Sequence, residues 1–331
     1  MDMAKRKYSK MKKIEPSVQT LLFTGTEIES DEDKTLFIDL SQCASIANRR
    51  FYRQGINWAV ASIRVIARPS NLDGTVYCPV TVQKLPNTWV MSNAWEKGFR
   101  AWKRQQDETL EDGNDSVKAK FNDFKIFMND QHLSEGFSRN LLPRDSLDNA
   151  ANPGEWEASQ IVIPNYGAPG TNYEPYIMAV GDDVGGAGGA FSLIKAYENS
   201  RSVPQSPDPV APGGVLNTEN IYRAMFDVGD NNEDVLENVV GKNDELPYDQ
   251  LAYPGGDNQL PGLQFHDEAV ISNTTVSSTL HLKGGNFPCG LMGIRFNNFF
   301  TGDVQKIYWD IIVDLVPGNH RGYLCEPMTE M

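Results

Sequence analysis

The sequence contains few cysteines and histidines, and it lacks the spacings in which these residues hold metals. Its four cysteines form no C-x-x-C pair, which excludes a zinc ribbon or a thioredoxin-like motif. We predict that they are buried free thiols. The four histidines stand far apart along the chain, so no two of them have the spacing of metal ligands.

The common catalytic signatures are also missing. The chain has no H-E-x-x-H motif, no G-x-S-x-G elbow and no G-x-x-x-x-G-K-[ST] phosphate loop. A glycine-rich run at 185–189 follows Asp182 and Asp183, whose charges would repel phosphate, so we interpret it as a turn. The sequence therefore predicts a protein that is not an enzyme.

No apolar run approaches the roughly 18–20 residues that a membrane-spanning helix needs. The most apolar segment, from Ile307 to Leu315, is interrupted by Asp310 and Asp314. No apolar stretch follows the first basic residues, which argues against a secretory signal. We expect a soluble protein without a membrane span.

No cofactor is expected from the sequence. The densest acidic cluster has the wrong spacing for an EF-hand, because neither the glycine nor the final glutamate of that loop is in place. A helix with acidic residues in its first turn explains the cluster more simply. A structural divalent cation at a subunit contact remains open as an alternative for these residues, which are Asp227, Asp230, Glu233 and Asp234.

What the sequence does have is a segregated charge. The chain carries a net charge of −14, whereas residues 1–13 contain six basic residues and one acid, a net +5, which leaves −19 for the remainder. The segment has no apolar periodicity, so we predict a disordered arm at residues 1–15. Polyphosphate suits such an arm, because each cation that neutralises a phosphate releases a condensed counterion. We predict that the nucleic-acid-binding residues are Lys5, Arg6, Lys7, Lys10, Lys12 and Lys13.

A solubilising or nuclear-targeting tail is the alternative interpretation of this arm. The first predicted helix also presents Lys97, Arg100 and Arg104 on one face. This basic face is either solvated or meets nucleic acid or a neighbouring subunit.

Alternation of apolar and polar residues with a period of two dominates the rest of the chain and predicts β-strands. Two helical stripes interrupt the strands, at Ser92 to Gln106 and at Val117 to Met128. About nine or ten strands separated by Gly, Pro and Asn clusters are typical of an all-β sandwich or barrel. The predicted strands are Thr35–Leu40, Trp58–Arg68, Thr75–Lys84, Ile161–Pro164, Tyr176–Val180, Phe191–Tyr197, Ala269–Asn273, Val276–Lys283, Leu291–Phe296 and Val304–Val316.

The stretch at about 198–264 is rich in Pro, Gly, Asn and acids, and we interpret it as elaborated surface loops inserted between strands. We therefore predict a single domain at residues 16–331 behind the arm at 1–15. A separate small domain within the insertion is the alternative.

Two segments resemble capsid proteins of small circular Rep-encoding single-stranded DNA viruses. The run Met3-Ala4-Lys5-Arg6-Lys7-Tyr8-Ser9-Lys10 is similar to their N-terminal arms, and the segment from Leu85 to Trp102 is similar in character to part of their coat proteins. The resemblance implies a jelly-roll β-sandwich with long inserted loops and a few short helices. It also implies self-assembly into an icosahedral shell that packages the viral genome, which would be single-stranded DNA.

On this interpretation the protein's partners are other copies of itself and the genome. Its location is the virion, assembled inside the host cell, with the nucleus as the candidate compartment. A soluble β-sandwich module that binds a carbohydrate or cell-surface ligand through loops and aromatic residues is the alternative function. A hydrolase without a recognisable signature is a third.

Overall fold

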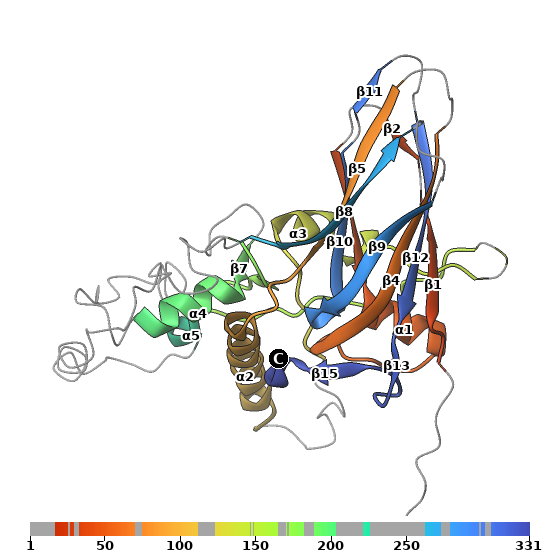
Figure 1. The fold of residues 1–331 in the computed structure, drawn as a ribbon. Coiled ribbons are helices and arrows are strands. Elements are labelled where there is room, and N and C mark those ends of the chain that lie inside the picture. Colours follow the sequence, from red (N-terminus) through yellow and green to blue (C-terminus); the bar gives the residue numbers. More distant parts are fainter. Residues whose placement is uncertain are drawn as a thin grey trace, which may run out of the picture.

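The computed structural model places eleven of its strands in two antiparallel sheets, which confirms the predicted all-β sandwich (Figure 1). It describes residues 17–25, 27–29, 33–69, 75–111, 123–145, 147, 149–164, 170, 172–181, 189–202, 221–225, 262–272, 279–297, 299–301 and 306–331. The predicted arm at 1–15 therefore lies outside the described residues, and so does most of the loop stretch at 198–264. The division into an arm and one domain stays a prediction.

The first sheet has the order β1-β12-β4-β9, with β2 beside β12. After β12 ends, β15 continues along the same side of β4, because β12 pairs with residues 60–69 and β15 with residues 56–58. The strands of this sheet are β1 (Thr20–Thr24), β2 (Ile28–Glu29), β4 (Ile56–Pro69), β9 (Thr279–Phe287), β12 (Lys306–Leu315) and β15 (Cys325–Pro327).

The second sheet has the order β3-β10-β5-β8, with β11 extending the pairing of β5. Its strands are β3 (Asp33–Asp39), β5 (Thr75–Lys84), β8 (Gln264–Ser272), β10 (Leu291–Asn297) and β11 (Phe299–Thr301). Two small pairs lie outside these sheets, namely β6 (Tyr176–Met178) with β7 (Ala190–Ser192) and β13 (Pro317–Gly318) with β14 (Gly322–Tyr323).

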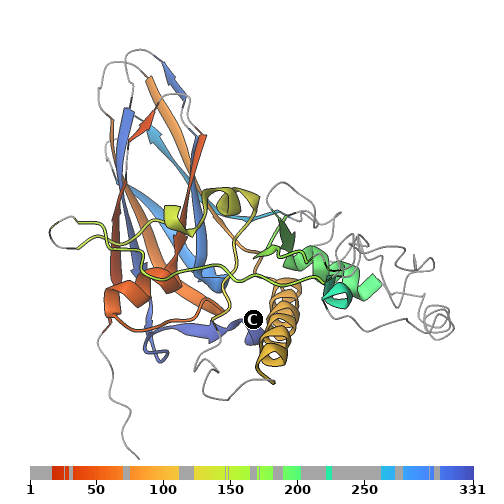
Figure 2. The ribbon, with the colours of Figure 1, turned by 180° about the vertical axis from the view of Figure 1, so that it is seen from behind.

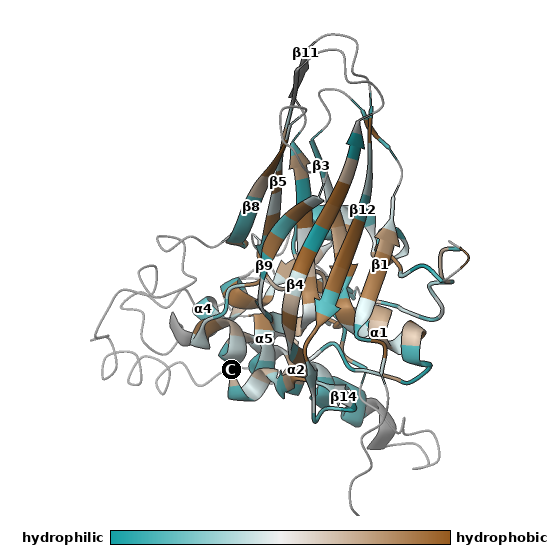
Figure 3. Ribbon diagram, turned by 45° about the vertical axis from the view of Figure 1, so that its right-hand side comes forward, coloured by the Kyte–Doolittle hydropathy of each residue, from teal (hydrophilic) through white to brown (hydrophobic). Residues whose placement is uncertain are grey.

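The facing sides of the two sheets bury a continuous apolar core. Along β12, Ile307, Trp309, Ile311, Val313 and Leu315 are each at most 2% exposed, and the residues between them are more exposed. Figure 3 shows this alternation of apolar and polar residues along β4 and β12. The Trp309 ring meets Phe296 of the opposite sheet at a centroid distance of 5.7 Å. The period-two pattern in the sequence therefore reports a sheet with one face in the core.

The helices lie in the segments that connect the strands. They are α1 (Leu40–Asn48), α2 (Trp89–Glu111), α3 (Asp130–Glu135), α4 (Leu193–Ser202) and α5 (Ile221–Ala224), with short 3₁₀ turns at Phe137–Arg139, Pro288–Gly290 and Met328–Glu330. All but α1 and the last two turns belong to the long insertion between β5 and β8. The first predicted helix is confirmed as α2, which begins three residues earlier and ends five later than predicted.

The predicted helix at Val117 to Met128 is wrong over its described part. Residues 123–128 have no helix, and Phe127 instead forms a parallel bridge to Met178. Phe124 and Met128 are nevertheless buried, as the apolar stripe predicted. Burial alone does not choose between helix and extended chain, and here the backbone of β6 supplies the hydrogen bonds.

Three further segments differ from the predicted secondary structure. The predicted strand Phe191–Tyr197 is extended only to Ser192 and then turns into α4, which packs against α2. Residues 161–164 contain only an isolated bridge at Ile163 and no strand. Strand β1, Thr20–Thr24, was not predicted at all.

A second apolar cluster fills the space between the insertion and the end of the sandwich. It contains Trp95 of α2, Ile177 of β6 and Leu193 of α4, but also Phe37 of β3 and Leu291 of β10. Since the cluster includes residues of the second sheet, the described part of the insertion shares its core with the sandwich.

One part of the insertion covers the side of the sandwich between β1 and β3. The backbone N–H of Leu141 donates to the carbonyl of Phe37 at 2.8 Å, and that of Arg144 donates to the carbonyl of Leu22 at 2.8 Å. Figure 2 shows this yellow-green segment crossing the strands. It occupies backbone groups at the edges of both sheets, where an uncovered strand would pair with another chain.

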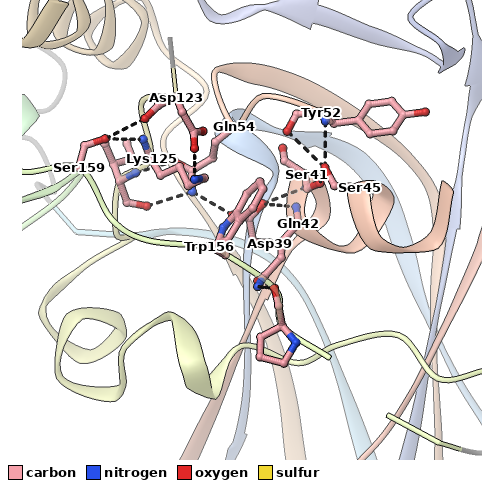
Figure 4. Close-up of polar contacts among 12 residues, drawn as sticks. Asp39, Ser41, Gln42, Ser45, Tyr52, Gln54, Asp123, Lys125, Trp156 and Ser159 are labelled. Carbon is pink, nitrogen blue, oxygen red and sulfur yellow. Dashed lines mark hydrogen bonds and ion pairs between the residues drawn. The ribbon is translucent and has the colours of Figure 1, made fainter. Parts of the chain in front are cut away.

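A buried carboxylate, Asp39, joins the second sheet to α1 and to the insertion (Figure 4). It ends β3 and caps α1, accepting hydrogen bonds from the backbone N–H groups of Ser41 at 2.9 Å and Gln42 at 3.2 Å. Its other oxygen accepts from the Gln54 amide and the Trp156 indole, each at 3.0 Å. Burial raises the pKa of Asp39 to about 6, against the opposing effect of these four donors.

The neighbours of Asp39 extend the same polar cluster. The Gln54 amide makes two hydrogen bonds to the backbone of Ile126, and the buried Lys125 pairs with Asp123. The Lys125 ammonium lies 4.5 Å from the centroid of the Trp156 ring, a cation–π contact. The insertion is therefore held to α1 and β3 by hydrogen bonds and charge as well as by apolar contact.

We expect Asp39→Ala to lower the free energy of unfolding by about 3–5 kcal/mol, because it removes the helix cap and leaves buried donors of Gln54 and Trp156 without their acceptor. Urea denaturation at neutral pH measures this. The matched control is Glu108→Ala, which breaks an exposed pair with Arg104 and should cost less than about 0.5 kcal/mol. Equal losses in both variants would contradict the structural role of Asp39.

A buried histidine gives the fold a pH dependence. His132 accepts from the N–H of Met128 at Nδ1, and its Nε2 donates to Asn140 at 2.8 Å, so the ring is held neutral. Burial lowers the pKa of His132 from 6.5 to about 4. In the unfolded chain this histidine takes up a proton below its ordinary pKa of 6.5, whereas in the folded chain it stays neutral down to about pH 4. Acidification from pH 6.5 toward pH 4 therefore destabilises the fold.

We therefore expect the stability advantage of the wild type over His132→Gln to shrink by about 2 kcal/mol between about pH 7 and about pH 5. Asp39 is present in both chains, and its raised pKa makes the folded state more stable as the pH falls over the same range. Comparing the two chains cancels this contribution. Urea denaturation of both at each pH measures the difference, and a constant difference would show that His132 is not buried neutral.

Candidate nucleic-acid interface

The residues predicted to bind nucleic acid, Lys5, Arg6, Lys7, Lys10, Lys12 and Lys13, lie outside the described residues. The structure instead describes the point where the arm joins the sandwich. The N–H of Val18 donates to the Asn48 side chain at 2.9 Å, and the buried Tyr323 hydroxyl donates to the carbonyl of Val18 at 2.6 Å. The Asn48 amide in turn donates to the Tyr323 hydroxyl at 2.7 Å.

The adjacent residues strengthen this attachment. The side chains of Ser17 and Gln19 both donate to the carbonyl of Gly322, each at 3.2 Å. Residues 17–19, which we call the arm root, are thus fixed between the end of α1 and the β13–β14 hairpin. Figure 1 shows α1 and this hairpin at the same end of the sandwich.

Four arginines lie on the two segments that hold the arm root, and we call them the exit cluster. Arg49, Arg50 and Arg53 follow α1, and Arg321 lies in the β13–β14 turn. The Arg321 guanidinium donates to the carbonyl of Phe51 at 2.5 Å, and the Tyr52 hydroxyl donates to the carbonyl of Arg321 at 3.0 Å. These two contacts hold the hairpin against the segment after α1.

The exit cluster presents charge to solvent. Arg49, Arg53 and Arg321 are exposed and Arg50 is half-buried. Burial, and secondarily the charge of Arg321, lower the pKa of the neighbouring His320, so that histidine adds no charge near neutral pH. Guanidinium groups bind phosphate oxygens with paired hydrogen bonds. A body with a large excess of acids therefore carries several arginines near the point where its basic arm begins.

Two of these arginines have backbone conformations that are unfavourable for any residue other than glycine. Arg49 has φ 53° and Arg321 has φ 52°, both in the left-handed region that favours glycine. Arg49 is the residue that ends α1, a position where glycine is common. Local backbone preference therefore does not account for arginine at either place.

The basic face expected on the first helix is different. Arg100 pairs with Glu96 and Arg104 pairs with Glu108, both within α2. Lys97 is half-buried, donates to Ser200 and lies 5.3 Å from the Tyr222 ring centroid, and burial lowers the pKa of Lys97. The charges on this face of α2 are therefore largely matched by neighbouring side chains.

Sequence reasoning missed the exit cluster, although the run Asn48-Arg49-Arg50-Phe51-Tyr52-Arg53 contains three of its arginines. The run reads as an ordinary polar loop on its own. Its significance comes from Arg321 and the arm root, which lie beside it only in the folded chain.

Other kinds of site find less support in the part of the chain that the structure describes. No group of three or more His, Cys, Asp or Glu residues there is placed to hold a metal ion. All four cysteines are free thiols, of which Cys43, Cys78 and Cys289 are buried. None of the described helices is both long and apolar enough to cross a membrane. The acidic cluster at 227–234 lies outside the described residues.

No family model, curated protein or solved structure matches the chain. The strand order and the geometry of the arm root and the exit cluster are therefore the guides to function.

We expect Arg49→Gly to raise the free energy of unfolding by about 1 kcal/mol, because glycine relieves the left-handed strain. The same variant should bind single-stranded DNA more weakly and reduce the slope of log K against log salt by about 0.7–1, the loss of one phosphate contact. Thermal denaturation and fluorescence-anisotropy titration at several salt concentrations measure the two effects.

Arg49→Lys is the matched control, since it keeps both the charge and the strained backbone. Its stability and salt slope should stay close to those of the wild type. An Arg49→Gly variant with an unchanged salt slope would remove Arg49 from the interface.

Proposed function

We propose that this protein is the coat protein of a small virus, which assembles with copies of itself into an icosahedral shell around a single-stranded DNA genome. The observation that carries the proposal is the strand order. The eight main strands, β1, β3, β4, β5, β8, β9, β10 and β12, divide into the sheets β1-β12-β4-β9 and β3-β10-β5-β8. In chain order, the first, third, sixth and eighth strands share one sheet, and the second, fourth, fifth and seventh share the other.

This division is the one expected of a jelly roll, an eight-stranded double sheet used by viral capsids, and also by lectins and cupins. The strand order therefore supports the jelly roll that the resemblance implies. The basic arm distinguishes a capsid interpretation from a lectin interpretation.

The distribution of charge supports the same function. The arm carries a net +5 and the rest of the chain −19. The arm root and the exit cluster lie at one end of the sandwich, so both basic elements can face the same polyanion. In a closed shell this end would face the genome, and the acidic surface would face outward or be neutralised at subunit contacts.

On this proposal the protein has no catalytic role and needs no cofactor, and a divalent cation at subunit contacts is an addition that assembly in chelator would test. Its location is the virion, after assembly in the host cell, with the nucleus as the candidate compartment. The apolar and polar contacts between subunits would supply the assembly energy, as in other symmetric oligomers.

The test is negative-stain electron microscopy of the purified full chain, with the ultraviolet absorbance spectrum of the same fraction as the measure of bound nucleic acid. We expect uniform closed particles that contain nucleic acid. A monodisperse monomer or small oligomer across a range of salt and pH would overturn the proposal.

The matched variant replaces the six basic residues of the arm by glutamine, which keeps the length of the arm and removes its charge. We expect particles that still close but hold less nucleic acid, because the wall is built by the sandwich and the genome is bound by cations. Particles with an unchanged content of nucleic acid would assign genome binding to the exit cluster alone.

A further inference from the structure

The outer face of the second sheet carries a polar hollow of about 350 Å³. Strands β3, β5 and β10 provide its floor, and the residues at the start of α3 provide part of its wall. This volume lies at the lower end of the range of about 300–1,000 Å³ typical of small-molecule sites. Its polar lining residues are Asp33, Thr35, Gln83, Asn129, Gln131 and Arg295.

An exposed aromatic side chain lies beside this hollow. Phe265 of β8 is 61% exposed, which is unusual for a phenylalanine in a strand. It pairs directly with Gln83 of β5, so the two side chains stand on the same face of the sheet. Leu263, two residues before Phe265, is itself part of the lining.

A β-bulge places Phe265 on that face. The register shifts between Val82 and Gln83, which adds a residue to β8. The two following residues, His266 and Asp267, both reach toward the first sheet, where they hydrogen-bond to the carbonyl and the N–H of Lys283 at 3.0 and 2.8 Å. Strict alternation would not send both of these neighbours to the same side, and the bulge leaves Phe265 facing outward.

The charges on the floor of the hollow cancel each other. Arg295 donates to both carboxylate oxygens of Asp33, at 2.8 and 2.5 Å. This pairing lowers the pKa of Asp33 and raises that of Arg295, so both stay charged and matched. The remaining polar lining groups are amides and a hydroxyl, which both donate and accept hydrogen bonds without net charge.

From this arrangement we propose that the hollow binds a neutral saccharide. The apolar C–H face of a sugar ring would pack on Phe265, and its hydroxyl groups would exchange hydrogen bonds with Gln83, Asn129 and Gln131. A polyanion is disfavoured here, because the one arginine is already bound to Asp33. The site is independent of the exit cluster, since β3 contributes its first residues to the hollow and leads into α1 only at its other end.

The test uses saturation-transfer difference NMR on the full chain with three neutral disaccharides, lactose, cellobiose and N,N′-diacetylchitobiose, at millimolar concentration. We expect saturation transfer to the ring protons of at least one of them. Phe265→Ala and Gln83→Ala should each weaken that binding by about tenfold. Because Phe265 is mostly exposed and Gln83 lies on the outer face, both variants should keep the thermal denaturation midpoint of the wild type.

Tyr77→Ala is the matched control. Tyr77 is an exposed aromatic residue on the same strand and face as Gln83, but about 20 Å farther along β5, and its loss should leave binding unchanged. The proposal would be overturned if none of the three sugars received saturation transfer. It would also be overturned if transfer were unchanged in both Phe265→Ala and Gln83→Ala. Stronger transfer to 3′-sialyllactose than to lactose would overturn the neutral class of ligand. None of these outcomes depends on particle formation, so the saccharide site and the shell can fail separately.

Discussion

The arrangement of this protein depends on the hydrogen bonds that the buried carboxylate of Asp39 accepts. Asp39 stands where β3 ends and α1 begins, and it receives hydrogen bonds from its own helix, from Gln54 and from Trp156. A buried charge is tolerated only when several donors converge on it. The need to bring these donors together therefore fixes α1, the segment before β4 and part of the insertion relative to the second sheet.

The position of α1 in turn sets where the basic elements lie. The helix ends at Asn48, whose side chain holds Val18, and the arginines that follow it are tied to the β13–β14 hairpin through Phe51 and Tyr52. The chain thus enters the sandwich at the end that carries the exposed arginines. The neutral hollow lies on the outer face of the second sheet, so the two surfaces are available to different ligands.

The outline of the fold was predictable and its connections were not. Strand β5 has the predicted bounds, and β4 and β12 are within a few residues of theirs, because their alternation records one face in the core. Helix α1 was missed because Thr35 to Leu40 reads as a strand and the capping role of Asp39 shows only once Ser41 and Gln42 turn back onto it. The stretch from Phe191 to Tyr197 alternates weakly, and packing of α4 on α2 decides it in favour of helix.

By itself the sequence determined a β-sandwich and a basic arm, because strand periodicity and charge segregation are local properties that any fold must accommodate. Tertiary structure alone decided which distant residues meet. Arg321 meets Phe51, in the segment after α1, when the β13–β14 hairpin packs on the end of that helix, and Phe265 meets Gln83 through strand register and a one-residue bulge. Register and bulges follow from the packing of whole sheets, which no short stretch of sequence encodes.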